Sequence, residues 1–541
     1  MSLKMPKAPG PALFKEGYRT QQGVEDVVIR NIHAISELSD ILRTSYGPNG
    51  CNKIIVNHLS KILVSSDAST ILEELDVVHP AAKMGDATNF VLIFAGELLK
   101  HAEALIRMGL HPSEIAEGYE IARDFALKTL DELSLDKVED IRCGNEILKA
   151  IKSSISSKQF GYEKLLGGLV AEAALLVLPK NPLLFNVDCI RVVKILGGCL
   201  DESRVVKGMV FPRDPEGIVR KVLKAKVGVF SCPLDISQTE TKGTVLLENS
   251  KQILEFSKGE EALLESMVKE LYNCGIRVVV TGGGIGDLVL HYLNKYNLLV
   301  IKVLSKFDLQ RLCRVVGATP LARLGAPMPE EMGFIDVVET IEIGGDRVTV
   351  FRQDAIVDSI ENETTRTATI VLRGATQNYL DDVERAIDDG VNLVKAIVKD
   401  PRLVAGAGAT EMELSKRIFS YSEKVSGIFQ YSVKKFAEAF EVIPRTLAEN
   451  AGLDSTEVLG KLYAFHHADN NSTIGIDIEG NNDVPFDARL AGIFDVLSVK
   501  SWACKLATEA ALTILRVDQI IMSKPAGGPK PPGPNPNWDN E

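Results

Sequence analysis

The sequence predicts a multidomain protein with α and α/β parts, in which an α/β region is inserted into a mostly helical one. Two observations predict this fold class. Residues 1–144 and the stretch after residue 405 carry apolar residues at helical spacing. Between them, short runs rich in Val and Ile alternate with helical patterns from about residue 215 to 370, which is typical of a sheet covered by helices.

The first helical part begins with a long helix at residues 27–45, which the bend YGPNGCNK at residues 46–53 interrupts. The runs NKIIV and KILVSSD then predict two short strands that form a hairpin. FAGELLKHAEALIRMGLHP predicts a helix that ends near Gly109 and Pro112, because glycine favours a helix end and proline cannot continue a helix.

The middle part contains five runs that predict strands, namely KVGVFSC, GIRVVVTGG, NLLVIKVL, RVTVFRQ and TATIVLRG. ENSKQILEFSKGEEALLESMVKELYNCG predicts a helix with a good apolar stripe in its second half. Its first half, with Ile253, Leu254 and Phe256, is expected to stand out from the body. Helices return with FQYSVKKFAEAFEVIPRTLAEN and KSWACKLATEAALTILRVDQII, and residues 525–541 are too rich in Pro, Gly and polar residues to pack, which predicts a disordered tail.

Composition narrows the function classes. The 541 residues, 45% of them hydrophobic and 25% charged, indicate a globular chain of about three domains. The net charge of −12 disfavours a general nucleic-acid binder, whose phosphate contacts need a basic surface. The start MSLKMPKAPG lacks the apolar core of a signal peptide, and no window reaches the roughly 18 apolar residues of a membrane span.

Cysteine and histidine patterns predict neither disulfides nor a metal site. The eight cysteines are scattered without a CxxC pair, as expected for reduced thiols in the cytoplasm. His466 and His467 have no further His or Cys at ligand spacing, so they are interpreted as surface histidines. VVVTGGGIGDLVLHYL has Asp287 where a dinucleotide fingerprint needs its third glycine, and is interpreted as a tight strand-to-helix turn.

Acidic residues and glycine turns recur in the two helical halves. Asp67 opens a helix after SSD, and Asp86 and Thr88 open another in MGDATNF. Helix starts suit phosphate, and Mg²⁺ can bridge carboxylate and phosphate oxygens. Asp388 and Asp389 follow in VERAIDDGVNLV, and LVAGAGATEMELS is a further glycine turn before a helix. Each of these alone is also consistent with an ordinary helix cap or turn.

Long stretches of this chain resemble the group II chaperonins. They are RTSYGPNGCNK, NHLSKILVSSDASTILEELDVVHPAAKM, GDATNFVL, ATIVLRGAT, VERAIDDGVN, KKFAEAFEVIPRTLAENAG and LRVDQIIMSKPAGGPKPP. The resemblance covers nearly the whole chain and implies the chaperonin fold. A mostly helical equatorial domain would comprise residues 1–144 and 405–524, a small intermediate domain residues 145–214 and 371–404, and an α/β apical domain with a helical protrusion residues 215–370.

The resemblance also implies a function. The chain would be one subunit of an ATP-dependent, hetero-oligomeric double ring, with seven paralogous subunits as partners in each eight-membered ring. ATP binding and hydrolysis, with Mg²⁺, would close a lid over a cavity in which actin, tubulin and other cytosolic proteins fold. Two alternatives stay open: a mainly structural and client-binding subunit with slow or absent ATP turnover, and a free-standing metabolic enzyme that uses the GGGIG turn.

The same resemblance also implies roles for individual residues. Asp389 looks like the carboxylate that positions or deprotonates the attacking water, and Asp67 like the acidic residue beside the γ-phosphate. Asp86 looks like the Mg²⁺ ligand, Thr88 like a phosphate contact, and Lys158 like the lysine that senses the γ-phosphate. The remaining nucleotide-binding residues that the resemblance implies are Gly47, Pro48, Gly406, Gly408, Asp477 and Asp495.

Client binding is expected on the apical helix KFDLQRLCRVVGA. Helical spacing assigns its apolar residues to the core, and these are Leu309, Leu312, Cys313 and Val316. The exposed candidates for client contact are Gln310, Arg311 and Arg314. The residues Ile253, Leu254 and Phe256 resemble the lid protrusion and are expected to pack against neighbouring subunits.

The sequence departs from the family pattern around the phosphates. Asn49 stands where the family has lysine, and alanine replaces glycine at positions 68, 87 and 407. Asn89 and Phe90 replace two threonines. Where alanine replaces glycine, the backbone has less room to come close to a phosphate group. We therefore expect the chain still to bind ATP but to hydrolyse it slowly. Met84 also runs directly into Gly85, where family members insert a helix; the chain is either truly shortened here or reflects a splice or gene-model artefact.

Overall fold

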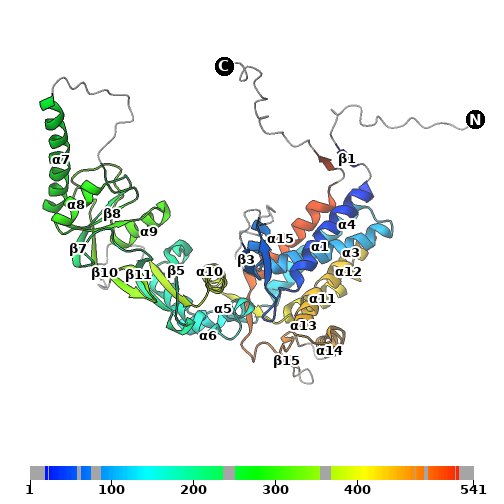
Figure 1. The fold of residues 1–541 in the computed structure, drawn as a ribbon. Helices are drawn as coiled ribbons and strands as arrows, with labels where there is room; N and C mark the ends of the chain where they lie inside the picture. The colour runs from blue at the N-terminus through cyan, green and yellow to red at the C-terminus, as the bar shows by residue number, and fades with distance from the viewer. Residues whose placement is uncertain are drawn as a thin grey trace, which may run out of the picture.

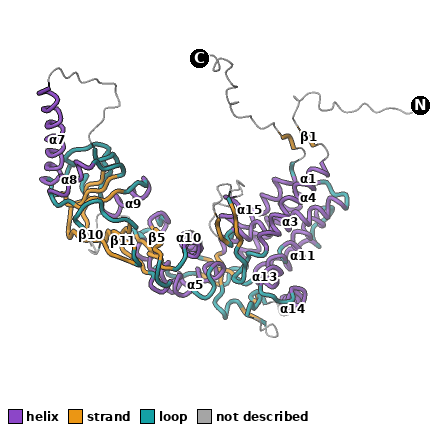
Figure 2. The backbone as a smooth tube through the Cα atoms, in the orientation of Figure 1, coloured by secondary structure: helices purple, strands orange, loops and turns teal. Residues whose placement is uncertain are grey.

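The computed structural model describes residues 19–21, 24–57, 62–74, 87–235, 250–353, 367–468, 471–479, 485–517 and 520–522. They form a helical region from the two ends of the chain, an α/β region from its middle, and a smaller region between them (Figures 1 and 2). The protein is therefore multidomain and mixes helices with sheets, as the sequence predicts. Among the described helices, none has both the length and the apolar character needed to cross a bilayer.

The helical region joins segments that lie far apart in the sequence (Figure 1). Its N-terminal helices are α1 (Val24–Arg43), α2 (Ala68–Glu74), α3 (Thr88–Arg107) and α4 (Pro112–Glu132). Its C-terminal helices are α11 (Ala409–Ser422), α12 (Phe429–Ala439), α13 (Val442–Asn450), α14 (Ser455–Ala468) and α15 (Leu497–Leu515). As predicted, α3 ends before Gly109, whose φ of 97° suits glycine, and Pro112 is the first residue of α4.

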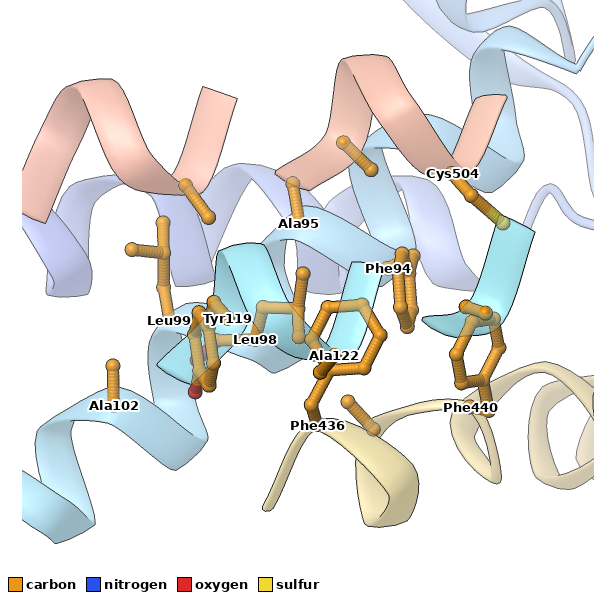
Figure 3. Packing of buried hydrophobic residues seen from close by; sticks show 14 of the residues in the cluster. Phe94, Ala95, Leu98, Leu99, Ala102, Tyr119, Ala122, Phe436, Phe440 and Cys504 are labelled. Atoms are coloured by element: carbon orange, nitrogen blue, oxygen red, sulfur yellow. The ribbon is translucent and has the colours of Figure 1, made fainter. Parts of the chain in front are cut away.

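Aromatic rings hold the two chain ends together (Figure 3). The ring centroid of Phe94 in α3 lies 5.7 Å from that of Phe436 in α12 and 4.5 Å from that of Phe440. Tyr119 of α4 packs on the same cluster and donates its hydroxyl to the Leu98 carbonyl at 2.9 Å. Because burying one such apolar side chain favours folding by about 1.5–3 kcal/mol, this cluster fixes α3 and α4 against the C-terminal helices.

Short strands complete the helical region. The predicted hairpin is present as β2 (Lys53–Val56) and β3 (Ile62–Ser65). Strand β1 (Arg19–Gln21) pairs with β17 (Ile520–Met522), and β14 (Ile474–Gly475) pairs with β15 (Phe486–Asp487). A further sheet has the order β16 (Phe494–Val496), β13 (Arg402–Ala405) and β4 (Asp136–Lys137). The predicted tail at residues 525–541 lies outside the described residues.

The α/β region is built on a sheet with the strand order β5-β12-β6-β11-β10-β7-β8-β9. The strands are β5 (Ile190–Leu196), β6 (Arg204–Phe211), β7 (Lys221–Phe230), β8 (Ile276–Thr281), β9 (Leu299–Lys302), β10 (Gly333–Ile343), β11 (Asp346–Arg352) and β12 (Ala368–Gly374). The five predicted runs correspond to β7, β8, β9, β11 and β12. Strand β10 was not predicted from the sequence, because acidic residues interrupt its apolar residues, as in GFIDVVETIEI.

The helices of the α/β region itself are α7 (Ser250–Asn273), α8 (Asp287–Lys295) and α9 (Lys306–Val316). In the second half of α7, Leu264, Val268 and Leu271 of the predicted stripe are buried, but Leu263, which the stripe also included, is 53% exposed. The side chains of Ile253, Leu254 and Phe256 lie outside the described residues. The glycine turn before α8 packs closely against the preceding loop, since a Cβ atom on Gly283 would stand 2.6 Å from Cα of Pro233. Close backbone packing therefore accounts for that glycine.

The region between the other two consists of α5 (Gly144–Lys158), α6 (Glu163–Val177) and α10 (Gln377–Lys399). Short 3₁₀ turns follow at Pro182–Leu184, Val187–Cys189 and Leu200–Glu202. Its core reaches both neighbours, because it includes Ile370 and Leu372 of β12 together with Phe494 and Val496 of β16. The long helix α10 is thus packed against the large sheet at one end and near the helical region at the other (Figure 1).

Candidate functional site

A cavity of about 720 Å³ lies where the two chain ends meet α5 and α10. The predicted site residues that line it are Gly47, Pro48, Asp67, Thr88, Lys158, Asp389, Gly408, Asp477 and Asp495. Gly406 lies directly behind this lining, since a Cβ atom there would stand 3.5 Å from Cγ of Asp495. Asp86 lies outside the described residues. The fold therefore brings together residues from both ends of the chain and from the region between them.

The bend at residues 46–53 forms one wall of the cavity and is a closed turn, not a linker. Gly47 has a φ of 85°, and a Cβ atom on it would stand 2.7 Å from Cδ2 of Leu447. Both the left-handed backbone and the close contact require glycine there. Asn450, from the other half of the chain, donates its Nδ2 to the Tyr46 carbonyl at 2.7 Å and to the Arg43 carbonyl at 3.0 Å. The bend is thereby held in place by a C-terminal helix.

Two helix N-termini face the cavity without a side-chain cap. Ala87 occupies the N-cap position of α3, and Gly408 that of α11, and neither residue has a side chain that can accept a hydrogen bond. Both line the cavity. The first amides of a helix have no partner within the helix, and they carry the positive end of the helix dipole. This pair of helix ends is therefore suited to bind phosphate groups.

Asp67 is fixed at the start of α2 by three hydroxyl groups. Its carboxylate accepts hydrogen bonds from Ser69, from Thr70 at 3.3 Å, and from Thr88 at 3.4 Å. Thr88 is the first residue of α3, so the carboxylate also ties the two helix starts together. Asn89, which replaces a family threonine, accepts a hydrogen bond from the Ala68 amide at 2.8 Å and supports the same junction.

Lys158 bridges the two predicted catalytic carboxylates. Its Nζ lies 2.5 Å from Oδ2 of Asp389 and 3.4 Å from Oδ1 of Asp67. The three side chains are 12%, 6% and 7% exposed, respectively, so the contact is well shielded from water. Burial raises the pKa of Asp67, but Lys158 and the hydrogen bonds from Ser69 lower it further, and the net pKa lies below the ordinary value. Asp67 is therefore ionised at neutral pH.

Two more predicted carboxylates line the cavity. Asp495 belongs to β16, where its backbone pairs with Val404 of β13, and its side chain is partly exposed. Its Oδ2 forms an ion pair with Nζ of Lys500 in α15, at a distance of 3.0 Å. Asp477 lies nearby in the loop after β14, where its Oδ1 accepts the Glu479 amide at 3.0 Å. These two residues offer hydrogen-bond acceptors beside the start of α11, since a Cβ atom on Gly406 would stand 3.5 Å from Cγ of Asp495.

Two of the three alanines that replace family glycines have left-handed backbones. Ala87 has a φ of 63° and Ala407 a φ of 55°, whereas Ala68 is the first residue of helix α2 and is fully buried. A left-handed conformation costs an alanine about 1–2 kcal/mol. The chain therefore stores strain at two places that line the cavity.

Restoring glycine at these two positions is expected to stabilise the chain by about 0.5–1 kcal/mol each, since glycine removes the left-handed cost but has a more flexible unfolded state. Ala68→Gly is the matched control and is expected to destabilise, because a buried helical methyl group is lost. Thermal unfolding of assembled particles that carry Ala87→Gly, Ala407→Gly or Ala68→Gly measures the change in stability caused by each substitution. Equal destabilisation by all three changes would contradict the strain argument.

The predicted client-binding helix α9 has the expected inner face. Leu309, Leu312, Cys313 and Val316 are buried, as predicted. Gln310 and Arg314 are exposed. Arg311 is half-buried, forms an ion pair with Asp308 at 3.2 Å, and donates Nε to the Asp188 carbonyl at 3.0 Å, so it is already engaged in a contact with the 3₁₀ turn before β5.

Sequence reasoning missed two exposed apolar residues at the same helix. Leu304 is 58% exposed and Phe307 is 74% exposed. Their position at the start of the helical pattern gives no signal in the sequence, because an apolar residue there is equally consistent with the core. Phe307, Gln310 and Arg314 give the exposed part of α9 a mixed apolar and polar character, and Leu304 lies just before the helix.

The interpretation of His466 as a surface histidine is wrong. The residue is 1% exposed, its Nδ1 lies 3.3 Å from Glu413, and its Nε2 lies 2.9 Å from the Ile474 carbonyl. It continues the buried face of α14 after Leu459 and Leu462, a helical spacing that was visible in the sequence. His467 is exposed, as expected. Among the described residues, no group of three or more His, Cys, Asp or Glu side chains could hold a metal ion by itself.

Two charged residues beside the cavity were also missed. Lys500 lines the cavity and pairs with Glu411 of α11, which is only 1% exposed. The available signal was the placement of both charges within apolar helical stripes, in GATEMEL and LSVKSWA. A charge at such a position is buried and needs a partner.

Comparisons with known proteins give one consistent result. The model of the TCP-1/cpn60 chaperonin family matches residues 38–525. The probable theta subunit of T-complex protein 1 from Schizosaccharomyces pombe is 63% identical, and the theta subunits from Saccharomyces cerevisiae and Homo sapiens are 53% and 50% identical. All three alignments cover the whole of both chains. The alignment with the S. pombe protein has 553 positions against 541 residues, so this chain lacks residues that the relative has.

Proposed function

The chain belongs to the TCP-1/cpn60 chaperonin family, and we propose that it is an ATP-hydrolysing subunit of a hetero-oligomeric double ring that encloses and folds cytosolic proteins such as actin and tubulin. Its partners in this proposal are seven paralogous subunits, and it acts in the cytoplasm. The observation that carries the proposal is the meeting of Asp67, Asp389 and Lys158 in a cavity bordered by two uncapped helix N-termini.

The donor set of the cavity fits a magnesium-bound triphosphate. Asp67 and Asp389 offer carboxylate oxygens, the ligand type that Mg²⁺ prefers, and the starts of α3 and α11 offer amides for phosphate oxygens. When bound, Mg²⁺ would be held by Asp86 and would neutralise charge on the phosphates. The sugar and base would then lie toward Asp495 and Asp477.

The chain's own carboxylates would act on the attacking water. Asp389 would accept its proton as a general base, and Asp67, ionised and fixed by three hydroxyl groups, would orient it for in-line attack on the γ-phosphate. The helix-start amides of α3 and the backbone of Gly47 and Pro48 would hold the phosphates still. Water attack needs little more from the protein than this positioning.

Hydrolysis would be coupled to movement through α5 and α10. These helices carry Lys158 and Asp389, and their core extends into β12 of the large sheet. Lys158 now pairs with the two carboxylates, and a γ-phosphate would offer it a third anionic partner. Gain and loss of that phosphate would bias the tilt of α5 and α10, and with it the α/β region and the protrusion α7, as in a two-state domain closure.

Surface features support ring assembly and client contact. The hairpin β2–β3 exposes Ile54, Val56 and Ile62 by 72%, 65% and 59%, which is a large apolar exposure for a free hairpin and favours burial against another subunit. On α9, the exposed residues Phe307 and Gln310 would contact unfolded clients. The domain boundaries given above for the equatorial, intermediate and apical parts belong to the same proposal.

A subunit with slow turnover is the second candidate. The strained alanines 87 and 407 favour it, because they line the cavity where backbone must approach phosphate. This candidate keeps nucleotide binding, assembly and client contact, and differs only in the rate of the chemical step.

Single-turnover ATP hydrolysis in assembled particles distinguishes the two. All other subunits would carry an inactivating substitution of the aspartate that corresponds to Asp389, so that the remaining signal comes from this chain alone. We expect measurable hydrolysis at a rate below that of the fastest subunit tested in the same way. Bound but unhydrolysed ATP favours the second candidate, and failure to bind ATP at all contradicts both.

A further inference from the structure

Lys500 is buried between two carboxylates at the edge of the cavity. Its side chain is 14% exposed and forms ion pairs with Glu411 of α11 and Asp495 of β16. Burial lowers the pKa of Lys500, but the two carboxylates raise it further, well above its ordinary value. The ammonium also lies 5.6 Å from the ring centroid of Phe90, which replaces a family threonine. Lys500 is therefore a fixed cation.

The two carboxylates differ in what they face. Glu411 is 1% exposed, and its Oε2 has no hydrogen-bond partner among the described residues, so the negative charge of Glu411 depends on Lys500. Asp495 is 27% exposed and lines the cavity. Lys500 contacts Oδ2 of Asp495 and leaves Oδ1 available on the same carboxylate. Glu411 thus holds the cation, and the cation holds the carboxylate that faces the cavity.

We propose that Lys500 is the positioning residue at the sugar end of the cavity: anchored by Glu411, it fixes Asp495 so that a ribose hydroxyl can donate to it, and thereby makes the site prefer ribonucleotides over deoxyribonucleotides. This inference rests on the proposed function, since it requires that the cavity binds a nucleotide. A hydroxyl donated to a charged acceptor is a strong hydrogen bond, and a site built for it rejects a ligand that lacks it.

The test uses assembled particles and a binding measurement that reports on this chain alone. Photolabelling with radioactive 8-azido-ATP, followed by separation of the subunits, is competed with ATP, 2′-deoxy-ATP and 3′-deoxy-ATP. In the unaltered chain we expect one deoxy analogue to compete about tenfold more weakly than ATP, as for loss of one charge-assisted hydrogen bond.

The informative variant is the pair Glu411→Gln and Lys500→Met, which removes one charge of each sign and so avoids an unbalanced buried charge. Glu411→Gln alone is its reference. We expect the double variant to reduce the tenfold preference to about twofold or less, and Glu411→Gln alone to give an intermediate preference, because Lys500 then loses its anchor but still pairs with Asp495. Full preference in the double variant would overturn the proposal and leave Lys500 as a structural ion pair.

If the double variant does not assemble into particles, a second variant tests the proposal. Asp495→Asn keeps the shape of the side chain but removes the charge that Lys500 holds, and the proposal expects the same loss of preference. Retained preference in Asp495→Asn would overturn the proposal as well. If the unaltered chain is not labelled, or ATP does not compete with the label, the proposed function fails instead.

Discussion

Replacing Asp389 by asparagine is expected to lower the single-turnover rate of ATP hydrolysis by this chain about 10²–10⁴-fold, the usual contribution of a general base. Asparagine keeps the size of the side chain but cannot accept the proton of the attacking water. Asp389 is well suited to that task, because it is 6% exposed, lies in the middle of α10, and shares Lys158 as an ion-pair partner with Asp67. Nucleotide binding should change far less than the rate, since the amides of α3 and α11 are untouched.

The neighbouring residue provides the control. Asp388 has the same side chain on the same helix, but it is exposed and does not line the cavity. We therefore expect Asp388→Asn to hydrolyse ATP at close to the rate of the unaltered chain. Rates are measured in particles whose other subunits are inactive, and nucleotide occupancy is measured in parallel. Equal losses in the two variants would mean that the charge of α10, and not a base at position 389, supports hydrolysis.

Local patterns predicted much of the fold. The stripes of α3, α7 and α9, the hairpin β2–β3 and five strands of the large sheet follow from spacing that a short window contains. Asp67 and Thr88 were identifiable because helix starts have a local signature. The inner face of α9 was predicted correctly for the same reason. Strands β5, β6 and β10 were missed, since their residues alternate or are broken by charges.

Long-range pairings could not be predicted from spacing. Nothing near residue 46 indicates that Asn450 will hold the bend, and nothing near Asp389 indicates that Lys158 will reach it. The resemblance supplied those residues as members of one site, but not the contacts between them. For Lys500 and His466 the local spacing indicated burial, but their partners could not be predicted, because tertiary packing decides which partner a charge or ring meets.

Replacing Lys158 by methionine is expected to destabilise the junction of α2, α5 and α10 by about 3–5 kcal/mol, because it leaves two buried carboxylates without their cation. Lys149→Met is the matched control on the same helix. Its partner Asp136 is 33% exposed and Lys149 is 36% exposed, so this pair contributes less than about 1 kcal/mol. Hydrogen–deuterium exchange of peptides from α2 and α10 in the assembled particle measures both changes.

The loss caused by Lys158→Met should also depend on pH with a definite sign. In the unaltered chain the pKa of Asp67 lies below its ordinary value, so its ionised form stabilises the fold, and this contribution disappears only as the pH falls through that lowered pKa. Without Lys158, the burial that raises the pKa of Asp67 loses its main opposing charge, so the pKa of Asp67 moves upward. The difference between the two chains should therefore be largest near neutral pH and shrink as the pH falls through that higher pKa. A difference that grows on acidification would mean that Lys158 does not hold these carboxylates in their charged form.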